Sequence, residues 1–489
     1  MVKNKNKRKQ SSLQSDAPLK IQKTSAIITP PPDVHGPKTI EGIGLHNDDL
    51  ELAVDTLNTL AANPAVLKTK GCRDLRTAVY QFQKACTAGF NAANDTNPTS
   101  RVSGALADGM YTEARILLAE MRIRMQTPKL GALCRWVREL DVVSGLAEQL
   151  DEHGPRRTAK EEELLVVLDS ILRLTGPTDY TLDKNLTMVA GPIIPRSAWN
   201  LRGTKERRKV YDSVLDRTFL NSSGISKSDF RIIEITPGLE RKPSNLHPAI
   251  VYTSRDNAVL LSQNHPKASH HNHPIVPNLH MLKDVLAPEE CESIIAAGET
   301  VGFVPDAPIR AEGEESSILA HNFYWVVDEA FNQRLWERVE HIVPKDVGGK
   351  KVRGLNRRFR VYRYVPGAEY RAHIDGAWPP SGIDPVTDKY IYDNSPPSGK
   401  QSSLFTFLIY LNDEFEAGET TFFLPSAREG SMNAYSVKPV QGSVLMFPHG
   451  ETEGSLLHEG TGVRNEGKPT AKYVIRTDVL YDVDATASA

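Results

Sequence analysis

The stretch Tyr364-Val-Pro-Gly-Ala-Glu-Tyr-Arg-Ala-His373-Ile374-Asp375-Gly376 is the most informative part of this chain. On an extended segment, side chains two residues apart point to the same face, so His373 and Asp375 can reach one ion without a bend in the backbone. One distant histidine would complete a set of two imidazoles and one carboxylate. Such a set leaves positions open on Fe(II) for a co-substrate and dioxygen. His458 is the candidate, because it lies between two strand-like runs, residues 442–447 and 472–481.

Further blocks follow in a fixed order around this segment: residues 282–291, 358–364, 407–412, 418–422 and 458–481. With the His-Ile-Asp segment, they make residues 278–482 resemble the prolyl 4-hydroxylase-like group of 2-oxoglutarate- and Fe(II)-dependent dioxygenases. The resemblance covers somewhat less than half of the chain. It implies a double-stranded β-helix (jelly roll) with flanking helices and with the metal near the mouth of the barrel.

The pattern of the residues is compatible with that fold. Short apolar and β-branched runs at residues 359–365, 404–411, 444–447 and 473–481 are separated by turn residues, as strands of a barrel are. Grouped apolar residues predict helices over residues 288–300 and 331–339, packed outside the barrel.

The resemblance also implies which residues act. His373, Asp375 and His458 are the predicted metal ligands and catalytic centre, and each must be deprotonated to bind the metal. The alternative is a surface aspartate with two hydrogen-bonded histidines. Tyr364 and Thr420 match family positions whose hydroxyls contact the co-substrate carboxylate. Their alternative is ordinary strand content, which sheets favour in any case.

The distal carboxylate of the co-substrate requires a cation, and the resemblance implies that this cation comes from the strand after His458. Lys472 matches when Lys-Tyr-Val-Ile-Arg-Thr-Asp is aligned as a block, and Arg476 on the same strand face is the second choice. Lys468 stands at the usual distance from His458 by counting alone, but it lies in a loop between Gly and Pro, so it ranks third. Each of the three has the alternative of being a solvated basic residue.

The implied cofactors and co-substrates are Fe(II), 2-oxoglutarate and dioxygen, with ascorbate as a further candidate. The implied reaction is hydroxylation coupled to decarboxylation of 2-oxoglutarate to succinate and CO2. A protein or peptide substrate is favoured, with prolyl side chains first. Two alternatives stay open: a nucleic-acid-directed oxygenase or demethylase, and an RNA- or protein-binding scaffold with an inactive oxygenase domain.

The sequence divides into four parts: residues 1–45, 46–153, 154–277 and 278–484. The first is predicted to be a disordered tail with a basic run that is either a nuclear localisation signal or merely solubilising. The second is helical by pattern at residues 52–60, 75–88, 112–124 and 130–140. Two of its segments look alike and start 36 residues apart, at Ala78 and Ala114, which is a helical-repeat period. The second segment, with residues 126–128 and the helix after it, weakly resembles a pentatricopeptide helix pair, and such repeats bind RNA in long arrays. A small helical bundle or a protein-binding solenoid is the alternative.

Residues 154–277 form a mixed region with a helix-like stretch at 161–174 and strand-like runs at 230–235 and 250–261. Five histidines occur near its end, His265, His270, His271, His273 and His280. They have no regular ligand spacing and no partnering cysteines, so a flexible linker is predicted rather than a second metal site. The Pro/Gly-rich segment 378–399, beside the ligands, predicts either a substrate-covering lid or disorder.

Composition excludes several classes of protein. A net charge of −2 over 489 residues gives no global attraction to nucleic acid or anionic membranes. The four cysteines have no paired spacing, which fits a reducing compartment and argues against a disulfide framework. No apolar run reaches membrane-spanning length, and the start lacks the apolar core of a signal peptide. A cytoplasmic or nuclear protein is therefore predicted.

Overall fold

The computed structural model describes residues 47–87, 97–145, 157–181, 192–203, 209–218, 221, 223–241, 244–265, 267–309, 319–450, 454–464 and 467–483. The tail predicted for residues 1–45 lies outside them, together with its basic run. The chain divides into two compact units, residues 1–82 and 83–489, each of which is described by itself.

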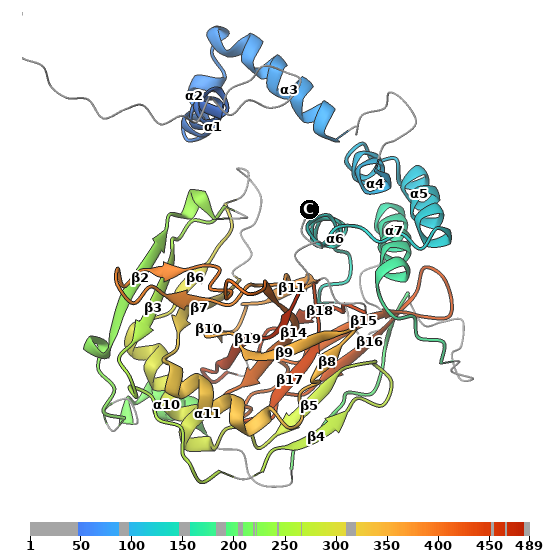
Figure 1. The fold of residues 1–489 in the computed structure, drawn as a ribbon. Coiled ribbons are helices and arrows are strands. Elements are labelled where there is room, and N and C mark those ends of the chain that lie inside the picture. Colours follow the sequence, from blue (N-terminus) through green and yellow to red (C-terminus); the bar gives the residue numbers. More distant parts are fainter. Residues whose placement is uncertain are drawn as a thin grey trace, which may run out of the picture. The chain divides into compact units, whose positions relative to one another are not determined.

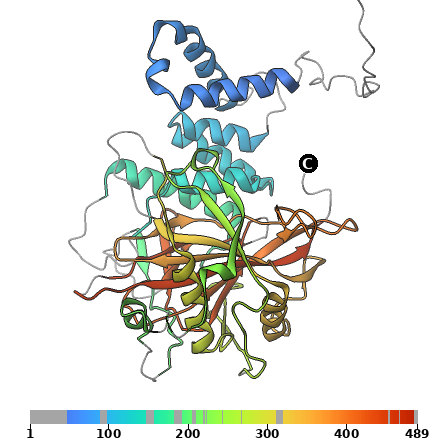
Figure 2. The same cartoon turned by 90° about the vertical axis from the view of Figure 1, so that its left-hand side faces the viewer.

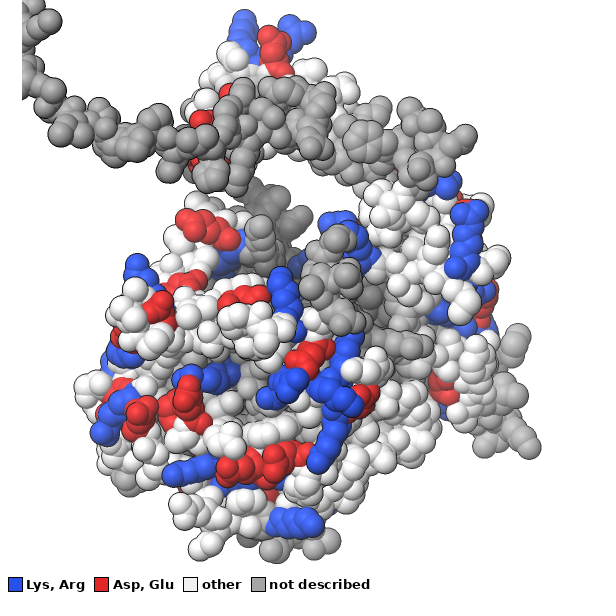
Figure 3. Space-filling view, viewed as in Figure 1, with Lys and Arg blue, Asp and Glu red and all other residues white. Residues whose placement is uncertain are grey.

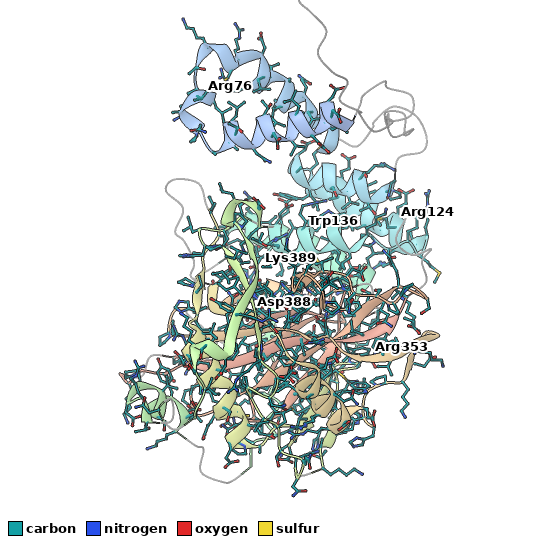
Figure 4. The ribbon with its side chains drawn as sticks, turned by 60° about the vertical axis from the view of Figure 1, so that its left-hand side comes forward. Arg76, Arg124, Trp136, Arg353, Asp388 and Lys389 are labelled. Carbon is teal, nitrogen blue, oxygen red and sulfur yellow. The ribbon has the colours of Figure 1, made fainter. Side chains whose placement is uncertain are left out.

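The described part of the first unit is helical. It contains α1 (Asn47–Ala61), α2 (Pro64–Leu67) and most of α3 (Arg73–Thr87), which confirms the helices predicted there. Arg76 of α3 donates to the carbonyl oxygens of Leu67 and Thr69 and so closes the turn between α2 and α3 (Figure 4).

Two β-sheets form the centre of the second unit (Figure 1). The minor sheet has the strand order β1-β16-β15-β18-β11, and the major sheet has the order β2-β3-β7-β10-β19-β14-β17-β5-β4, with β6, β8 and β9 beside this path. The strands are β1 (Ile193–Pro195), β2 (Phe230–Thr236), β3 (Ala249–Ser254), β4 (Ser269–Asn272), β5 (His280–Lys283), β6 (Val304–Asp306), β7 (Leu319–Val326), β8 (Asp346–Val347), β9 (Lys350–Leu355), β10 (Arg358–Tyr364), β11 (Tyr370–His373), β14 (Gln401–Tyr410), β15 (Thr420–Pro425), β16 (Met432–Val437), β17 (Val444–Pro448), β18 (Leu457–Gly460) and β19 (Lys472–Asp482). The four barrel strands predicted from the sequence are β10, β14, β17 and β19. The arrangement is consistent with a jelly roll.

Helices cover the outer face of each sheet (Figure 2). On the major sheet lie α10 (Pro288–Val301) and α11 (Glu329–Val339), as predicted. On the minor sheet lie α6 (Leu130–Glu139) and α7 (Ala159–Thr175), and α4 (Pro98–Ala107) and α5 (Tyr111–Ile123) pack on these helices. A third cluster of buried residues, among them Tyr364, Phe422 and Val474, fills the space between the sheets. The short helix α8 (Val210–Leu215) adds Val210 to the core on the major-sheet side.

The helices α4–α7 share one hydrophobic cluster with the minor sheet. Trp136 of α6 and Leu168 of α7 belong to the same cluster as Ala372, Phe423 and Leu457 of the sheet (Figure 4 marks Trp136). The domain boundaries predicted at residues 153/154 and 277/278 therefore do not coincide with divisions between hydrophobic clusters. The reason is that the outer face of the minor sheet is apolar and must be buried.

The packing of α5 also differs from a repeat. It packs against α4, a helix that the sequence pattern did not indicate, and against α7. The expected partner was the helix that follows it, α6, which instead lies on β11. The pentatricopeptide resemblance is thus unconfirmed.

The flexible linker predicted around the five histidines is wrong for residues 269–283. They form an antiparallel hairpin, β4–β5, at the edge of the major sheet. Its turn is closed by His273, whose Nδ1 accepts from the amides of Ile275 and Val276 at 3.1 and 2.8 Å. Burial of Val276 and Met281 between the sheets explains why this segment is ordered.

Charges of both signs are interspersed over the face of the second unit in Figure 3, in keeping with the balanced composition. Among the described residues, no helix is both long and apolar enough to cross a membrane. Cys72, Cys134 and Cys291 are free thiols.

Candidate active site

Three predicted metal ligands meet at the mouth between the two sheets. His373 ends β11 and is the cross-strand neighbour of His458 on β18, which puts their ring centroids 4.4 Å apart. Asp375 follows on the same face as His373, and its carboxylate oxygens lie 3.2 Å from Nε2 of His373 and 3.6 Å from Nε2 of His458. One ligand atom from each residue lies within 4.8 Å of the others, the only such group found among the described residues. This spacing suits three ligands on one face of a small cation.

Backbone carbonyls set the tautomers of both histidines. Nδ1 of His373 donates to the Arg371 carbonyl at 2.7 Å, and Nδ1 of His458 donates to the Leu456 carbonyl at 3.1 Å. A proton held on Nδ1 leaves the lone pair of Nε2 free toward Asp375. Burial, reinforced by the neighbouring His373, also lowers the pKa of His458 to about 4, so its imidazole is neutral near pH 7. Both rings are thus prepared to bind a metal.

Arg476 keeps the carboxylate of Asp375 ionised. Burial alone would raise the pKa of Asp375, but the charge of Arg476 holds it well below its usual value. Nη1 of Arg476 lies 2.9 Å from Asp375 Oδ1, and Nη2 donates to the Gly376 carbonyl at 3.0 Å. Arg476 is therefore committed to the predicted metal ligand.

A chain of hydrogen bonds that the sequence did not indicate reaches the other oxygen of Asp375. Thr406 donates to Oδ2 at 2.7 Å, and Nδ1 of the buried His449 lies 2.7 Å from the same hydroxyl. Because the Thr406 proton points to Asp375, His449 donates through Nδ1 and accepts through Nε2 from Ser403, at 2.8 Å. Ser403 in turn accepts from the amide of Trp378 at 2.8 Å. The chain links the predicted metal ligand to the start of the 378–399 segment. The only sequence signals were Thr406, among the apolar residues at the end of β14, and His449, directly after β17.

Lys472 lies on the floor of the space between the sheets, where it is only 1% exposed. Its Nζ donates to the Gly418 carbonyl at 2.7 Å and lies 4.5 Å from the ring centroid of Tyr364, its cross-strand neighbour. Burial lowers the pKa of Lys472 to about 7. The carbonyl, the ring and the electrostatic attraction of Glu419 do not offset the burial of the ammonium, so the position favours an anionic ligand.

The other predicted co-substrate residues are placed as follows. Thr420 is the cross-strand neighbour of Gly460, two residues from His458, and its hydroxyl lies 2.8 Å from that of Tyr410. Gly460 faces the Tyr364 hydroxyl, since a Cβ there would lie 3.0 Å from it. Lys468 is exposed in its loop, away from the buried cluster, which leaves Lys472 as the buried cation.

The segment after α6 holds both ligand-bearing strands from outside. Ser144 accepts from the amide of Ala372 at 2.7 Å, and Asp141 lies 3.0 Å from Nε of Arg371, both on β11. The amide of Gly145 donates to Glu459 of β18 at 2.8 Å. We name residues 141–145 the clamp. Because β11 is the edge of the minor sheet, the clamp satisfies a backbone group that the sheet itself leaves unpaired.

Residues 378–399 are ordered, so the alternative of disorder is wrong. They contain the hairpin of β12 (Gly382–Ile383) and β13 (Tyr390–Ile391). Asn356 fixes the start of the segment, donating to the Pro379 carbonyl at 2.9 Å and accepting from the Ser381 amide at 3.1 Å. Asp388 pairs with Arg231 of β2, beside the green strands in Figure 4.

The family match of residues 359–477 agrees with this site. Residues 359–477 match the 2OG-Fe(II) oxygenase superfamily. Among solved structures, the chain is similar to an oxidoreductase of the 2OG-Fe(II) oxygenase family from Burkholderia pseudomallei, with 14% identity over 42% of this chain and 84% of that chain, and a TM-score of 0.26. No curated protein matches the chain.

Proposed function

Because residues 359–477 belong to the 2OG-Fe(II) oxygenase superfamily, we propose that the protein is a dioxygenase that hydroxylates a protein side chain, with prolyl side chains as the first candidates. The observation that carries the proposal is the convergence of His373, Asp375 and His458 within 4.8 Å. Fe(II) bound there supplies the activation of dioxygen that oxidises a C–H bond, with 2-oxoglutarate decarboxylated to succinate and CO2.

The protein's own groups have distinct roles in this proposal. His373 and His458 offer Nε2 to the metal because their Nδ1 protons are held by carbonyls. Arg476 and Thr406 each hold one oxygen of Asp375 and so fix its direction. We assign Arg476 this positioning role rather than the binding of 2-oxoglutarate.

Lys472 binds the distal carboxylate of 2-oxoglutarate, with the hydroxyls of Tyr364 and Thr420 beside it. Thr420 pairs with Gly460, two residues from His458, which is roughly 7 Å along a strand. That separation suits a short dicarboxylate with one end at the metal and the other at Lys472. Ascorbate binding stays a prediction from the resemblance.

The choice of a protein substrate rests on the sequence resemblance, and fold alone does not fix a substrate. For the nucleic-acid alternative, the basic run in residues 1–45 lies outside the described residues. The scaffold alternative requires a degraded site, whereas the buried Lys472 and the three converging ligands are all present.

The test is succinate formation from 2-oxoglutarate by protein loaded anaerobically with Fe(II) and then exposed to air. His373→Ala is expected to abolish turnover. Lys472→Ala is expected to raise the 2-oxoglutarate concentration needed for half-maximal succinate formation, and activity should recover at high 2-oxoglutarate. Lys468→Ala is the matched control, since the exposed lysine should leave the requirement unchanged. An iron-loaded protein that consumes no 2-oxoglutarate, with or without added peptides, would rule out the proposal.

A further inference from the structure

The guanidinium of Arg358, at the start of β10, is packed but unpaired. Its Cζ lies 4.4 Å from the ring centroid of Tyr324 and 4.1 Å from that of Trp378. Its Nε is buried without a hydrogen-bond partner, and no side-chain hydrogen bond or ion pair joins Arg358 to the residues that the structure describes. The carboxylate of Asp478 is close enough to interact with it electrostatically, but that carboxylate lies 3.3 Å from Nη2 of Arg476.

Other arginines on β10 and β19 have acidic partners. Arg360 pairs with Asp306, Arg363 with Glu299 and Arg476 with Asp375. A cation desolvated by two aromatic rings is costly to leave uncompensated. Arg358 is therefore the place on this face where a partner from outside the chain would be stabilising.

Arg358 stands at the mouth of the candidate site. It is two residues from Arg360, the cross-strand neighbour of Arg476, and it shares that strand face. Its stacking partner Trp378 follows Asp375 by three residues. Two residues of strand are roughly 7 Å, so a group bound to Arg358 would lie within a few residues' reach of the metal ligands.

The surroundings of Arg358 are held in place before any ligand binds. Asn356, two residues earlier, holds Pro379 and Ser381, and the Trp378 amide is held by Ser403. Tyr392 packs edge-on to Trp378 at 5.8 Å and is 56% exposed, which extends the aromatic surface outward. A rigid cation with an apolar surround costs little entropy on binding.

The chemistry of this arrangement selects a planar anion. Because the rings pack on the faces of the guanidinium, only its in-plane N–H groups can still bind a partner. Two such N–H groups can donate to both oxygens of one carboxylate. We infer that Arg358 binds an aspartate or glutamate side chain of the substrate. Since an extended chain spans about 3.3–3.6 Å per residue, the acidic residue lies about two to four residues from the hydroxylated one. The inference rests on the proposed function, whose substrate class it narrows.

The test uses synthetic peptides with a varied central residue, proline included, and with Asp, Asn, Lys or phosphoserine at each flanking position. Binding is measured by fluorescence anisotropy under anaerobic conditions with Fe(II) and 2-oxoglutarate, so hydroxylation is not needed. Asp peptides should bind more tightly than their Asn counterparts. Arg358→Gln should reduce that Asp/Asn ratio by about tenfold to a hundredfold. Arg358→Glu should reverse the preference toward Lys, and Arg358→Lys should retain part of it.

Lys389→Gln is the matched control, because Lys389 is an exposed cation of the same 378–399 segment (Figure 4). Lys389→Gln should leave the Asp/Asn ratio unchanged. If it lowered the ratio as much as Arg358→Gln does, the effect would come from the overall positive charge, and the inference would be overturned. An Arg358→Gln variant that keeps the wild-type ratio, or an absence of binding by every acidic peptide, would also overturn it. So would dependence on Arg358 that appears only with phosphoserine peptides or oligonucleotides.

Peptide-free 2-oxoglutarate turnover, measured in parallel, separates the two proposals. Peptide-free turnover, combined with a wild-type Asp/Asn ratio in Arg358→Gln, would leave the oxygenase standing and remove the inference. Acidic selectivity that depends on Arg358, in a protein without turnover, would leave the binding site and remove the oxygenase.

Discussion

Lys472 illustrates how single residues act in this protein. Its ammonium is buried against the Tyr364 ring and the Gly418 carbonyl, and Gly418 has a positive φ of 74° that lets the chain turn beside it. A Cβ at Gly418 would approach Phe415 to 2.6 Å and Lys472 to 3.3 Å. The close approach of backbone and lysine thus requires glycine at this position.

The affinity for 2-oxoglutarate should depend on pH through Lys472. Its pKa is lowered to about 7 by burial, so the unliganded side chain loses its proton above that pH. A bound carboxylate favours the ammonium, and binding above pH 7 must take up a proton. We expect a Kd that is constant just below pH 7 and rises by up to about tenfold per pH unit above it. Titration calorimetry at several pH values measures this. Lys472→Arg, which stays protonated, should remove the dependence, and a dependence that survived in it would contradict the assignment.

Thr406 should influence the Fe(II) affinity through its hydrogen bond to Asp375. Thr406→Val removes the hydroxyl that donates to Oδ2 of Asp375 while conserving shape. Outer-shell hydrogen bonds of this kind typically change metal affinity by about 10- to 100-fold, and we expect a loss in that range. Anaerobic Fe(II) titration measures it. Thr421→Val is the control, because Thr421 is equally buried but bonds to Ser436 instead. Equal losses in both variants would point to general destabilisation.

Among elements, the clamp and β11 are the pair on which the site depends. The ligand-bearing strand is short, at four residues, and lies at a sheet edge. Its regular partner is β18 alone, so its outer side relies on Ser144, Asp141 and the neighbouring α6. Holding a ligand strand by a preceding segment makes the helices part of the site's support.

Ser144→Ala should loosen β11. The change leaves the Ala372 amide without its partner, at a typical cost of about 1–3 kcal/mol for a buried group. We expect faster hydrogen exchange at residues 370–375 and weaker Fe(II) binding, both measurable by mass spectrometry and titration. Ser170→Ala on α7 is the control, since that hydroxyl bonds only within its own helix. Unchanged exchange in the Ser144 variant would show that the clamp does not hold the strand.

At the scale of the whole molecule, the two parts of the N-terminal half differ in how much the fold of the second unit depends on them. Residues 1–82 form a unit of their own, whereas α4–α7 complete a hydrophobic cluster with the minor sheet. Removal of the first should leave the second unit intact, and removal of both should expose the apolar face of the minor sheet.

Two truncations test this. A chain that starts at Asn97, the residue that caps α4, should bind Fe(II) and unfold cooperatively like the full chain. A chain that starts at Arg157 lacks α4, α5, α6 and the clamp, and we expect aggregation or loss of cooperative unfolding. Size-exclusion chromatography and urea denaturation distinguish the outcomes. A soluble, cooperative protein from the shorter chain would show that the shared cluster is not needed.

The local features of this protein could be predicted from its sequence. His-x-Asp on an extended segment places both groups on one face, and the runs at β10, β14, β17 and β19 have the residue types of buried strands. Helices α10 and α11 follow from apolar periodicity within a few residues. These features depend on neighbours close in the chain, which is why pattern alone predicts them.

Which distant residues come into contact depends on the tertiary structure. Thr406 in β14 and His449 after β17 are distant in sequence from Asp375 until the fold brings them to it, and Arg358 has no ion-pair partner among the described residues whereas Arg360, Arg363 and Arg476 do. The histidines of β4–β5 belong to an ordered hairpin because Val276 and Met281 are buried between the two sheets. Hydrogen bonding and burial at these positions depend on partners tens to hundreds of residues away, so no local pattern contains them.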